Sequence, residues 1–144
     1  MLQRIQTVYL VVAILLAGLA SFLLPFWVDQ NNEIVNLKSL LVSGDVIFVI
    51  VPILFMVSGI LSILTLLLFK NRTKQIIYNR LNIVVNFLLL GIIVYHQLKL
   101  PGGTIVSEKG IGVFIPLLVV VFLALANKAI IKDDKLVKSV DRLR

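Results

Sequence analysis

Three asparagines, Asn79, Asn82 and Asn86, stand three and four residues apart in an otherwise apolar stretch. At about 100° per helical residue they fall within about 60° of one another and form one stripe. Such a stripe can bond neighbouring helices, or it can line a polar path. An unpaired amide in hydrocarbon costs several kcal/mol, whereas a paired one contributes about 0.6 to 2 kcal/mol to helix association. We therefore expect a helix-packing stripe that faces protein.

Partners for these amides are offered by small and hydroxyl-bearing residues at helical spacing in two other apolar runs. Faces of this kind let helix backbones approach closely and accept amide hydrogen bonds. They are Ala13, Ala17 and Ser21 in the first run, and Ser58, Ser62 and Thr65 in the second.

The ionisable residues within or beside the apolar runs form no reactive group. Arg80 lies about one turn inside its run, so its long stem can carry the guanidinium back to the lipid headgroups. His96 and Glu108 are twelve residues apart and make a weak metal pair, so an interfacial histidine is the better interpretation. The chain has no cysteine, and no Asp or Glu lies inside an apolar run. We predict no enzyme, no metal and no cofactor.

These residues must be positioned by helices that cross a membrane. Hydrophobic residues make up 60% of the 144 residues, against about 45–50% in soluble domains. About 20 apolar residues are needed to cross the hydrocarbon. We predict an all-α membrane protein whose two helical hairpins span the bilayer at about 7–28, 46–69, 75–95 and 110–127. Residues 1–127 then form the transmembrane bundle and residues 128–144 a tail.

The first span has a competing interpretation as a signal peptide, because Gly18-Leu19-Ala20 imitates a cleavage site. The apolar run continues through FLLPFW, however, and Trp27 stands where an interfacial aromatic would anchor a full-length span. We expect an uncleaved helix. The outer connections are short, and the β-branched content of EIVNLKSLLV and GTIVS is typical of short strands, which could form a small paired cap.

The distribution of positive charge predicts the orientation. Of the 14 Lys and Arg residues, 11 fall on the side of the termini and of the connection between the second and third spans. The other side receives Lys38, Lys99 and Lys109. Because cytoplasmic loops carry the excess of Lys and Arg, both termini are expected in the cytoplasm of a bacterial inner-membrane protein.

The tail NKAIIKDDKLVKSVDRLR is predicted to be a short amphipathic cytoplasmic helix continuing the fourth span. Each basic side chain near an anionic leaflet contributes about 1 kcal/mol of attraction. The tail should lie on lipid headgroups or dock on a membrane-protein partner, and it lacks the aromatic residues that would favour nucleic acid. The docking residues would be Lys132, Lys135, Lys138, Arg142 and Arg144.

Three stretches, MLQRIQTVYL, SEKGIGVFIPLL and LANKAIIKDDKLVKSVDRLR, resemble a family of small four-helix membrane proteins of Bacteroidota, domain of unknown function 4293. The resemblance covers essentially the whole chain. It implies a multi-pass protein of the bacterial inner membrane, and it assigns no catalytic or binding residue.

The sequence thus favours a non-enzymatic structural, assembly or accessory factor in the membrane, either bound to a partner or as a homo-oligomer. The alternative is a small oligomeric channel or transporter. Its path would be lined by the polar face of the third span, with Asn79, Asn82, Asn86 and Arg80.

Overall fold

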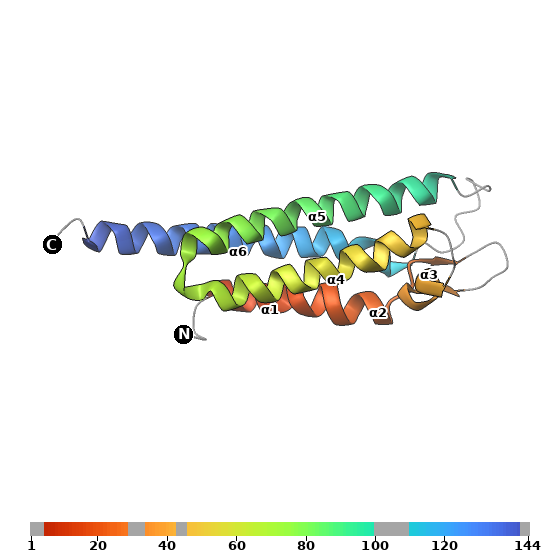
Figure 1. Ribbon diagram of the computed structural model, residues 1–144, viewed down its shortest axis with the longest axis horizontal. Helices are drawn as coiled ribbons and strands as arrows, with labels where there is room; N and C mark the ends of the chain where they lie inside the picture. Colours follow the sequence, from red (N-terminus) through yellow and green to blue (C-terminus); the bar gives the residue numbers. More distant parts are fainter. Residues whose placement is uncertain (1–4, 29–33, 43–45, 100–109, 142–144) are drawn as a thin grey trace.

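The computed structural model describes residues 5–28, 34–42, 46–99 and 110–141. Four long helical segments dominate these residues, with a short helix and a two-stranded ribbon at one end (Figure 1). The helices are α1 (Ile5–Leu15), α2 (Ser21–Leu23), α3 (Leu37–Val42), α4 (Val46–Leu67), α5 (Arg72–Lys99) and α6 (Ile115–Asp141). The π-helical turn Leu16–Ala20 joins α1 to α2, and 3₁₀ turns occupy Leu68–Lys70 and Ile111–Phe114.

The four long segments lie side by side and form a closed ring (Figure 1). Around this ring α1 packs on α4, α4 on α5, α5 on α6 and α6 on α1, so α5 lies diagonally opposite α1. Each segment is long and apolar enough to cross a membrane, over Ile5–Leu23, Val49–Lys70, Arg72–His96 and Ile111–Ser139. The prediction of four spans is confirmed.

Large apolar side chains occupy both the core and the outer surface of the bundle, as expected of helices in lipid. Large side chains such as Leu10, Phe55 and Leu123 are buried between the helices. Others, including Ile53 and Leu81, are exposed on the outside of the bundle.

The first helix is shorter than the predicted range of 7–28. It ends at Leu23, and Leu24 already has an extended backbone (φ −92°, ψ 138°). Proline fixes its own φ, lacks an N–H and disfavours the helical conformation of the residue before it, so Pro25 explains the stop. As a consequence Trp27 lies in a strand rather than at the end of the helix.

The third and fourth helices are longer than predicted. The sequence predicts the third helix over 75–95, but α5 has 28 residues and runs from Arg72 to Lys99. Its buried face begins at Gln75, one turn before Asn79. Helix α6 has 27 residues and passes without a break through residue 128, the predicted boundary of the tail. The described part of the tail therefore continues the fourth helix, as the sequence predicts, and its C-terminal part extends straight beyond the bundle (Figure 1).

A cap closes the end of the bundle near α3. Strands β1 (Trp27–Val28) and β2 (Ile34–Val35) pair antiparallel, with Trp27 opposite Val35. The main chain of the segment before α6 joins this ribbon: the Gly110 N–H donates to Phe26 O (3.1 Å) and the Gly112 N–H to Pro25 O (2.9 Å). A Cβ atom on Gly110 would stand 2.1 Å from Pro25 O, so this approach requires glycine.

The expectation of strands in the outer connections is only partly correct. Ile34–Val35 is a strand, but the following residues form α3. Ser39 explains the change, because its Oγ accepts the Asn36 N–H (2.9 Å) and donates to Asn36 O (2.7 Å), closing the first turn. Leu37 and Leu40 then bury one face of this helix. The other stretch, GTIVS (103–107), lies outside the described residues.

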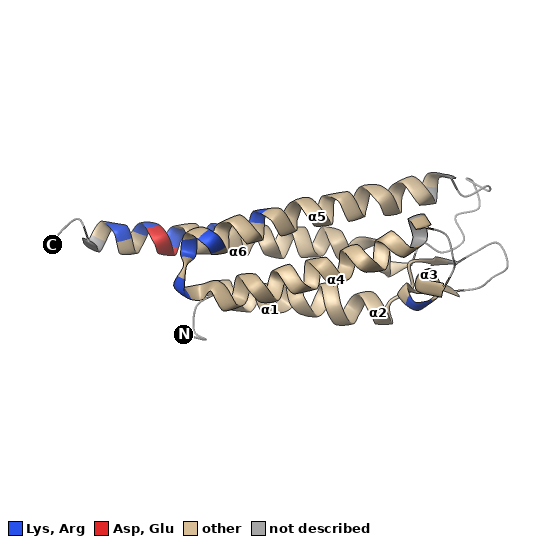
Figure 2. Cartoon of the chain, viewed as in Figure 1, with Lys and Arg blue, Asp and Glu red and all other residues tan. Residues whose placement is uncertain are grey.

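Lys and Arg gather at one end of the bundle, around the α4–α5 connection and the projecting part of α6 (Figure 2). We call this the basic end. Helix α3, which contains Lys38, lies at the opposite, capped end (Figure 2).

Candidate functional site: a buried amide seam

Helix α5 carries four buried amide side chains on one face. Gln75, Asn79, Asn82 and Asn86 are each no more than 1% exposed. Their spacing of four, three and four residues keeps them on the same side of the helix. Sequence reasoning found the three asparagines and missed Gln75, although its position one turn before Asn79 extends the same stripe. We call the four residues the amide seam.

Two asparagines of the amide seam bond to the serine face of α4. Asn82 Nδ2 donates to Ser62 Oγ (2.7 Å) and to Ser58 O (3.1 Å), and Asn86 Nδ2 donates to Ser58 Oγ (2.7 Å). The Ser62 hydroxyl in turn donates to Ser58 O (2.9 Å). Both hydroxyls therefore accept an amide proton from the neighbouring helix, as the sequence pattern indicates.

The ends of the seam reach further partners. Gln75 Nε2 donates to Thr65 O in α4 (3.0 Å), and Asn79 Nδ2 donates to Leu123 O in α6 (2.8 Å). The amide seam thus ties α5 to both of its neighbours in the ring, through bonds that cross 10 to 44 residues of sequence.

The first helix does not supply the partners expected of it. Ala13, Ala17 and Ser21 are buried, but they lie on a helix that packs on α4 and α6. The Ser21 hydroxyl donates within its own helix, to Ala17 O (2.6 Å) and Gly18 O (3.0 Å). These small residues serve close packing, while the carbonyl that Asn79 needs comes from α6.

The amide orientations follow from their acceptors. Thr65 O, Leu123 O and Asn82 O are main-chain carbonyls with no proton to give, so only the NH₂ group of Gln75, Asn79 or Asn86 can face them. The carbonyl oxygens Gln75 Oε1, Asn79 Oδ1 and Asn86 Oδ1 are consequently buried acceptors, and they find no donor in the described part of the chain. Asn82 Oδ1 differs, because it accepts from Asn86 Nδ2 (3.0 Å).

The buried amides of α5 lie in the half of the bundle at the basic end. One turn beyond Asn86 the buried residues of α5 are Leu89 and Ile93. Phe26 and Phe55 meet there with ring centroids 5.6 Å apart. Buried Val51 and Ile115 belong to the same apolar cluster. Along α5, the buried amides therefore give way to buried apolar side chains toward the cap.

Trp27 and Arg80, the two residues expected at the lipid interface, differ in burial: Trp27 is buried and Arg80 is exposed. Trp27 lies in β1, is 5% exposed and stands edge-on to Phe26 at 6.4 Å between ring centroids. It is part of the cap and lies in a strand, not at the end of a helix. Arg80 is exposed on α5, next to the buried Asn79 but on the outside of the bundle. Within one chain it does not line a path together with the amide seam.

The tail residues lie on the projecting part of α6. Lys132, Lys135 and Lys138 are exposed, and Lys138 Nζ lies 2.6 Å from Asp134 Oδ2 one turn away. Arg142 and Arg144 fall outside the described residues, as does Glu108. Among the side chains that the structure places, no three of His, Asp or Glu gather as a metal site would require.

Comparison with known proteins adds one finding. A family model described as "Domain of unknown function (DUF4293)" matches residues 2–143. Comparison with curated proteins and with solved structures gives no match.

Proposed function

The chain belongs to the DUF4293 family, and from that premise we propose that it is a non-enzymatic, multi-pass protein of the bacterial inner membrane that acts as a structural, assembly or accessory factor. The match extends over nearly the whole chain and confirms the resemblance seen in its motifs. The four apolar helices agree with a membrane protein. The factor role is an inference from the buried polar residues and from the surface that α6 presents.

The observation that carries the proposal is that each NH₂ group of the amide seam donates to another part of the same bundle. Asn79 bonds to α6, while Gln75, Asn82 and Asn86 bond to α4. In lipid, apolar helices gain little from burying apolar surface, so side-chain hydrogen bonds and close packing must hold them together. Polar groups used in this way support a rigid framework.

The orientation belongs to the same proposal. We place the basic end in the cytoplasm, with both termini there and the helices arranged as two hairpins, because Lys and Arg accumulate on the cytoplasmic side of membrane proteins. The cap then faces the periplasm. The projecting part of α6 presents exposed Lys132, Lys135 and Lys138 to the cytoplasm, where anionic headgroups or a protein partner would meet them.

The channel or transporter remains the second candidate, and one observation favours it. The oxygens of Gln75, Asn79 and Asn86 that find no donor in the described chain are the kind of group that a polar solute would engage. Against it, the interior beyond Asn86 is apolar and packed with aromatic rings. A path through one chain would have to cross that half. We therefore favour the framework.

The experiment replaces all three asparagines with leucine (N79L/N82L/N86L). If the amides hold the helices together, the variant loses its folded, monodisperse form in mild detergent and accumulates poorly in membranes. The matched control changes three lipid-facing residues of the same helix to alanine, Leu81, Val84 and Leu88, and should remain folded. If the leucine variant folds normally but loses a solute or ion flux that the wild type shows, the channel or transporter is the correct function.

A pull-down from native membranes in mild detergent tests the factor role. We expect a membrane-protein companion that is retained by the wild type and lost from K132E/K135E/K138E. A companion that is retained equally by both would move the docking surface away from α6, and a chain recovered alone would argue against an assembly role.

A further inference from the structure

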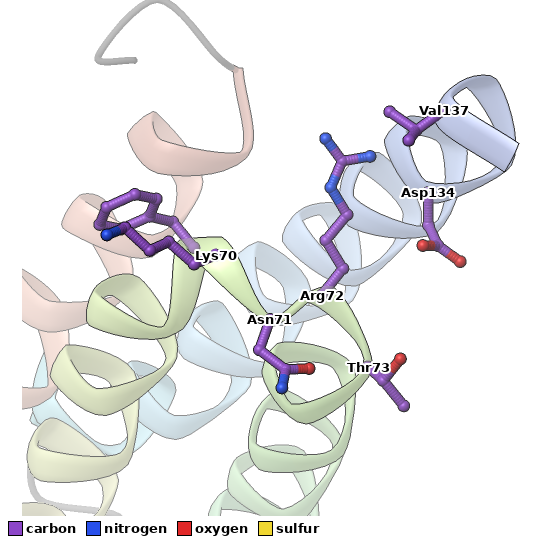
Figure 3. A pocket seen from close by; sticks show the side chains of 7 residues that line it. Lys70, Asn71, Arg72, Thr73, Asp134 and Val137 are labelled. Carbon is purple, nitrogen blue, oxygen red and sulfur yellow. The ribbon is translucent and has the colours of Figure 1, made fainter. Parts of the chain in front are cut away.

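A hollow of about 400 Å³ lies at the basic end, between the α4–α5 connection and the projecting part of α6 (Figure 3). This volume is within the range of about 300–1,000 Å³ that is common for small-molecule sites. We call it the basal hollow. It is lined by Phe69, Lys70, Asn71, Arg72, Thr73, Asp134 and Val137.

The wall formed by the α4–α5 connection is cationic. Lys70 and Arg72 both line the hollow, and Lys70 has no ion-pair partner in the part of the chain that the structure places. Arg72 Nη1 donates to Asp133 O (2.6 Å), and its Nη2 lies 4.0 Å from the Asp133 carboxylate. A guanidinium has five N–H donors, so this contact positions the side chain along α6 and leaves donors for a ligand. Asn71 and Thr73 add neutral donors.

The single acid in the wall does not cancel this charge. Asp134 Oδ2 lies 2.6 Å from Lys138 Nζ, which neutralises it from its own helix. Asp133 partly offsets the charge of Arg72, so Lys70 is the uncompensated cation of the lining in the described part of the chain. The charges of Lys70, Arg72 and Lys138 against those of Asp133 and Asp134 leave a net charge of +1 around the basal hollow (3 − 2), which favours an anion.

The apolar residues in the lining favour an anionic ligand that also has an apolar part. Phe69 lines the hollow and is itself partly exposed, and the side chain of Leu67, two residues earlier, faces outward among the lipid-facing residues. Val137 adds an apolar contact from the opposite wall. A ligand with its charged group against Lys70 and Arg72 could lay its apolar part against Phe69 and Val137.

We propose that the basal hollow binds the headgroup of an anionic phospholipid, with Lys70 and Arg72 contacting the phosphate and α6 as the opposite wall. Basic pockets beside transmembrane helices on the cytoplasmic side bind such headgroups. The site rests on the membrane location in the proposed function and names one partner of it. It would seat a lipid where α6 leaves the bundle, joining the α4–α5 connection to the projecting helix.

The test uses the full chain in bilayers of phosphatidylglycerol and phosphatidylcholine, followed by native mass spectrometry of the lipids that stay bound. The wild type should retain phosphatidylglycerol selectively. Each basic residue near the headgroups contributes about fivefold to affinity, so K70Q/R72Q should weaken retention about 25-fold. The control K38Q removes one cation from an exposed residue at the capped end, outside the hollow, and should weaken retention far less than K70Q does.

The outcomes separate the possible explanations. If K38Q weakens retention as much as K70Q does, the attraction is diffuse and the site does not exist. If millimolar inorganic phosphate displaces the lipid, the ligand is a free anion and the assignment to phospholipid is wrong. If R72Q disturbs folding through its contact with Asp133, the comparison of K70Q with K38Q decides alone.

Failure of this inference is distinguishable from failure of the proposed function. Bilayers of uniform composition present the same lipids on both sides, so retention does not depend on the orientation in the cell. Reporter fusions that find the basic end in the periplasm would overturn the orientation and leave the retention result standing.

Discussion

Asn79 in α5 donates a hydrogen bond from Nδ2 to the main-chain carbonyl of Leu123 in α6, at 2.8 Å and across 44 residues of sequence. The next two asparagines of the seam turn to α4 instead. One face of α5 therefore bonds to two different helices. Substitution of Asn79 should weaken the packing of α5 on α6, whereas substitution of Asn82 or Asn86 should weaken its packing on α4.

We predict that Asn79→Ala weakens the packing of α5 on α6 and lowers the free energy of unfolding by about 0.6 to 2 kcal/mol, the range for interhelical hydrogen bonds in membranes. Leu123 O keeps the acceptor role of its own helix, which limits the loss. Steric trapping in micelles measures the change. Val84→Ala, on the exposed face of α5, is the control, and an equal loss there would show that side-chain volume is responsible.

Asn86 and Ser58 should be energetically coupled, because Asn86 Nδ2 donates to the Ser58 hydroxyl at 2.7 Å. A double-mutant cycle with N86A and S58A should give a coupling of about 0.6 to 1.7 kcal/mol. The pair Asn86 and Thr65 provides the comparison, since the Thr65 hydroxyl donates within α4 to Leu61 O. Coupling of similar size in both pairs would contradict direct bonding.

Gly110→Ala should disrupt the cap, because the new Cβ would meet Pro25 O at 2.1 Å and the Phe26 carbonyl carbon at 2.7 Å. The clashing atoms belong to the backbone, which cannot move aside as the end of a flexible side chain can. Overpacking of this kind lowers the free energy of unfolding by about 1–3 kcal/mol. Thermal unfolding in detergent, followed by Trp27 fluorescence, reports on the cap directly.

Gly91→Ala is the matched control for the cap, since nothing lies within 4 Å of the position of its Cβ. Alanine is favoured over glycine in a helix by about 1 kcal/mol. Gly91→Ala should leave the stability unchanged or raise it. If both variants lost similar stability, the contact of Gly110 with Pro25 would not explain the effect of Gly110→Ala.

The projecting part of α6 should stand in water along the direction of the bundle. Ile130 is still fully buried, so the part beyond it, residues 131–141, adds about 16 Å at 1.5 Å per residue. Single cysteines can be placed cleanly because the chain has none. Spin labels at Lys135, Leu136 and Ser139 in bilayers should be equally accessible to a water-soluble relaxation agent. Accessibility that alternates with helical period would instead indicate a helix lying on the headgroups.

Local features of the sequence were sufficient for much of this description. The four spans follow from the lengths of the apolar runs, because the hydrocarbon thickness sets the length of a helix. The asparagine stripe follows from the helical period, which depends only on spacing along the chain. The serine face of α4 was identified in the same way, and family membership followed from whole motifs.

The tertiary structure decided the partners. The order of helices around the ring determines that Asn79 meets Leu123 in α6 rather than the small residues of α1, and no periodicity within a single helix encodes that order. The tertiary structure also brings Gly110 against Pro25, 85 residues earlier in the chain. It places Trp27 in a strand of the cap and Arg72 beside Asp133. Spacing shows which side chains share a face, whereas their contacts depend on how the separate helices pack.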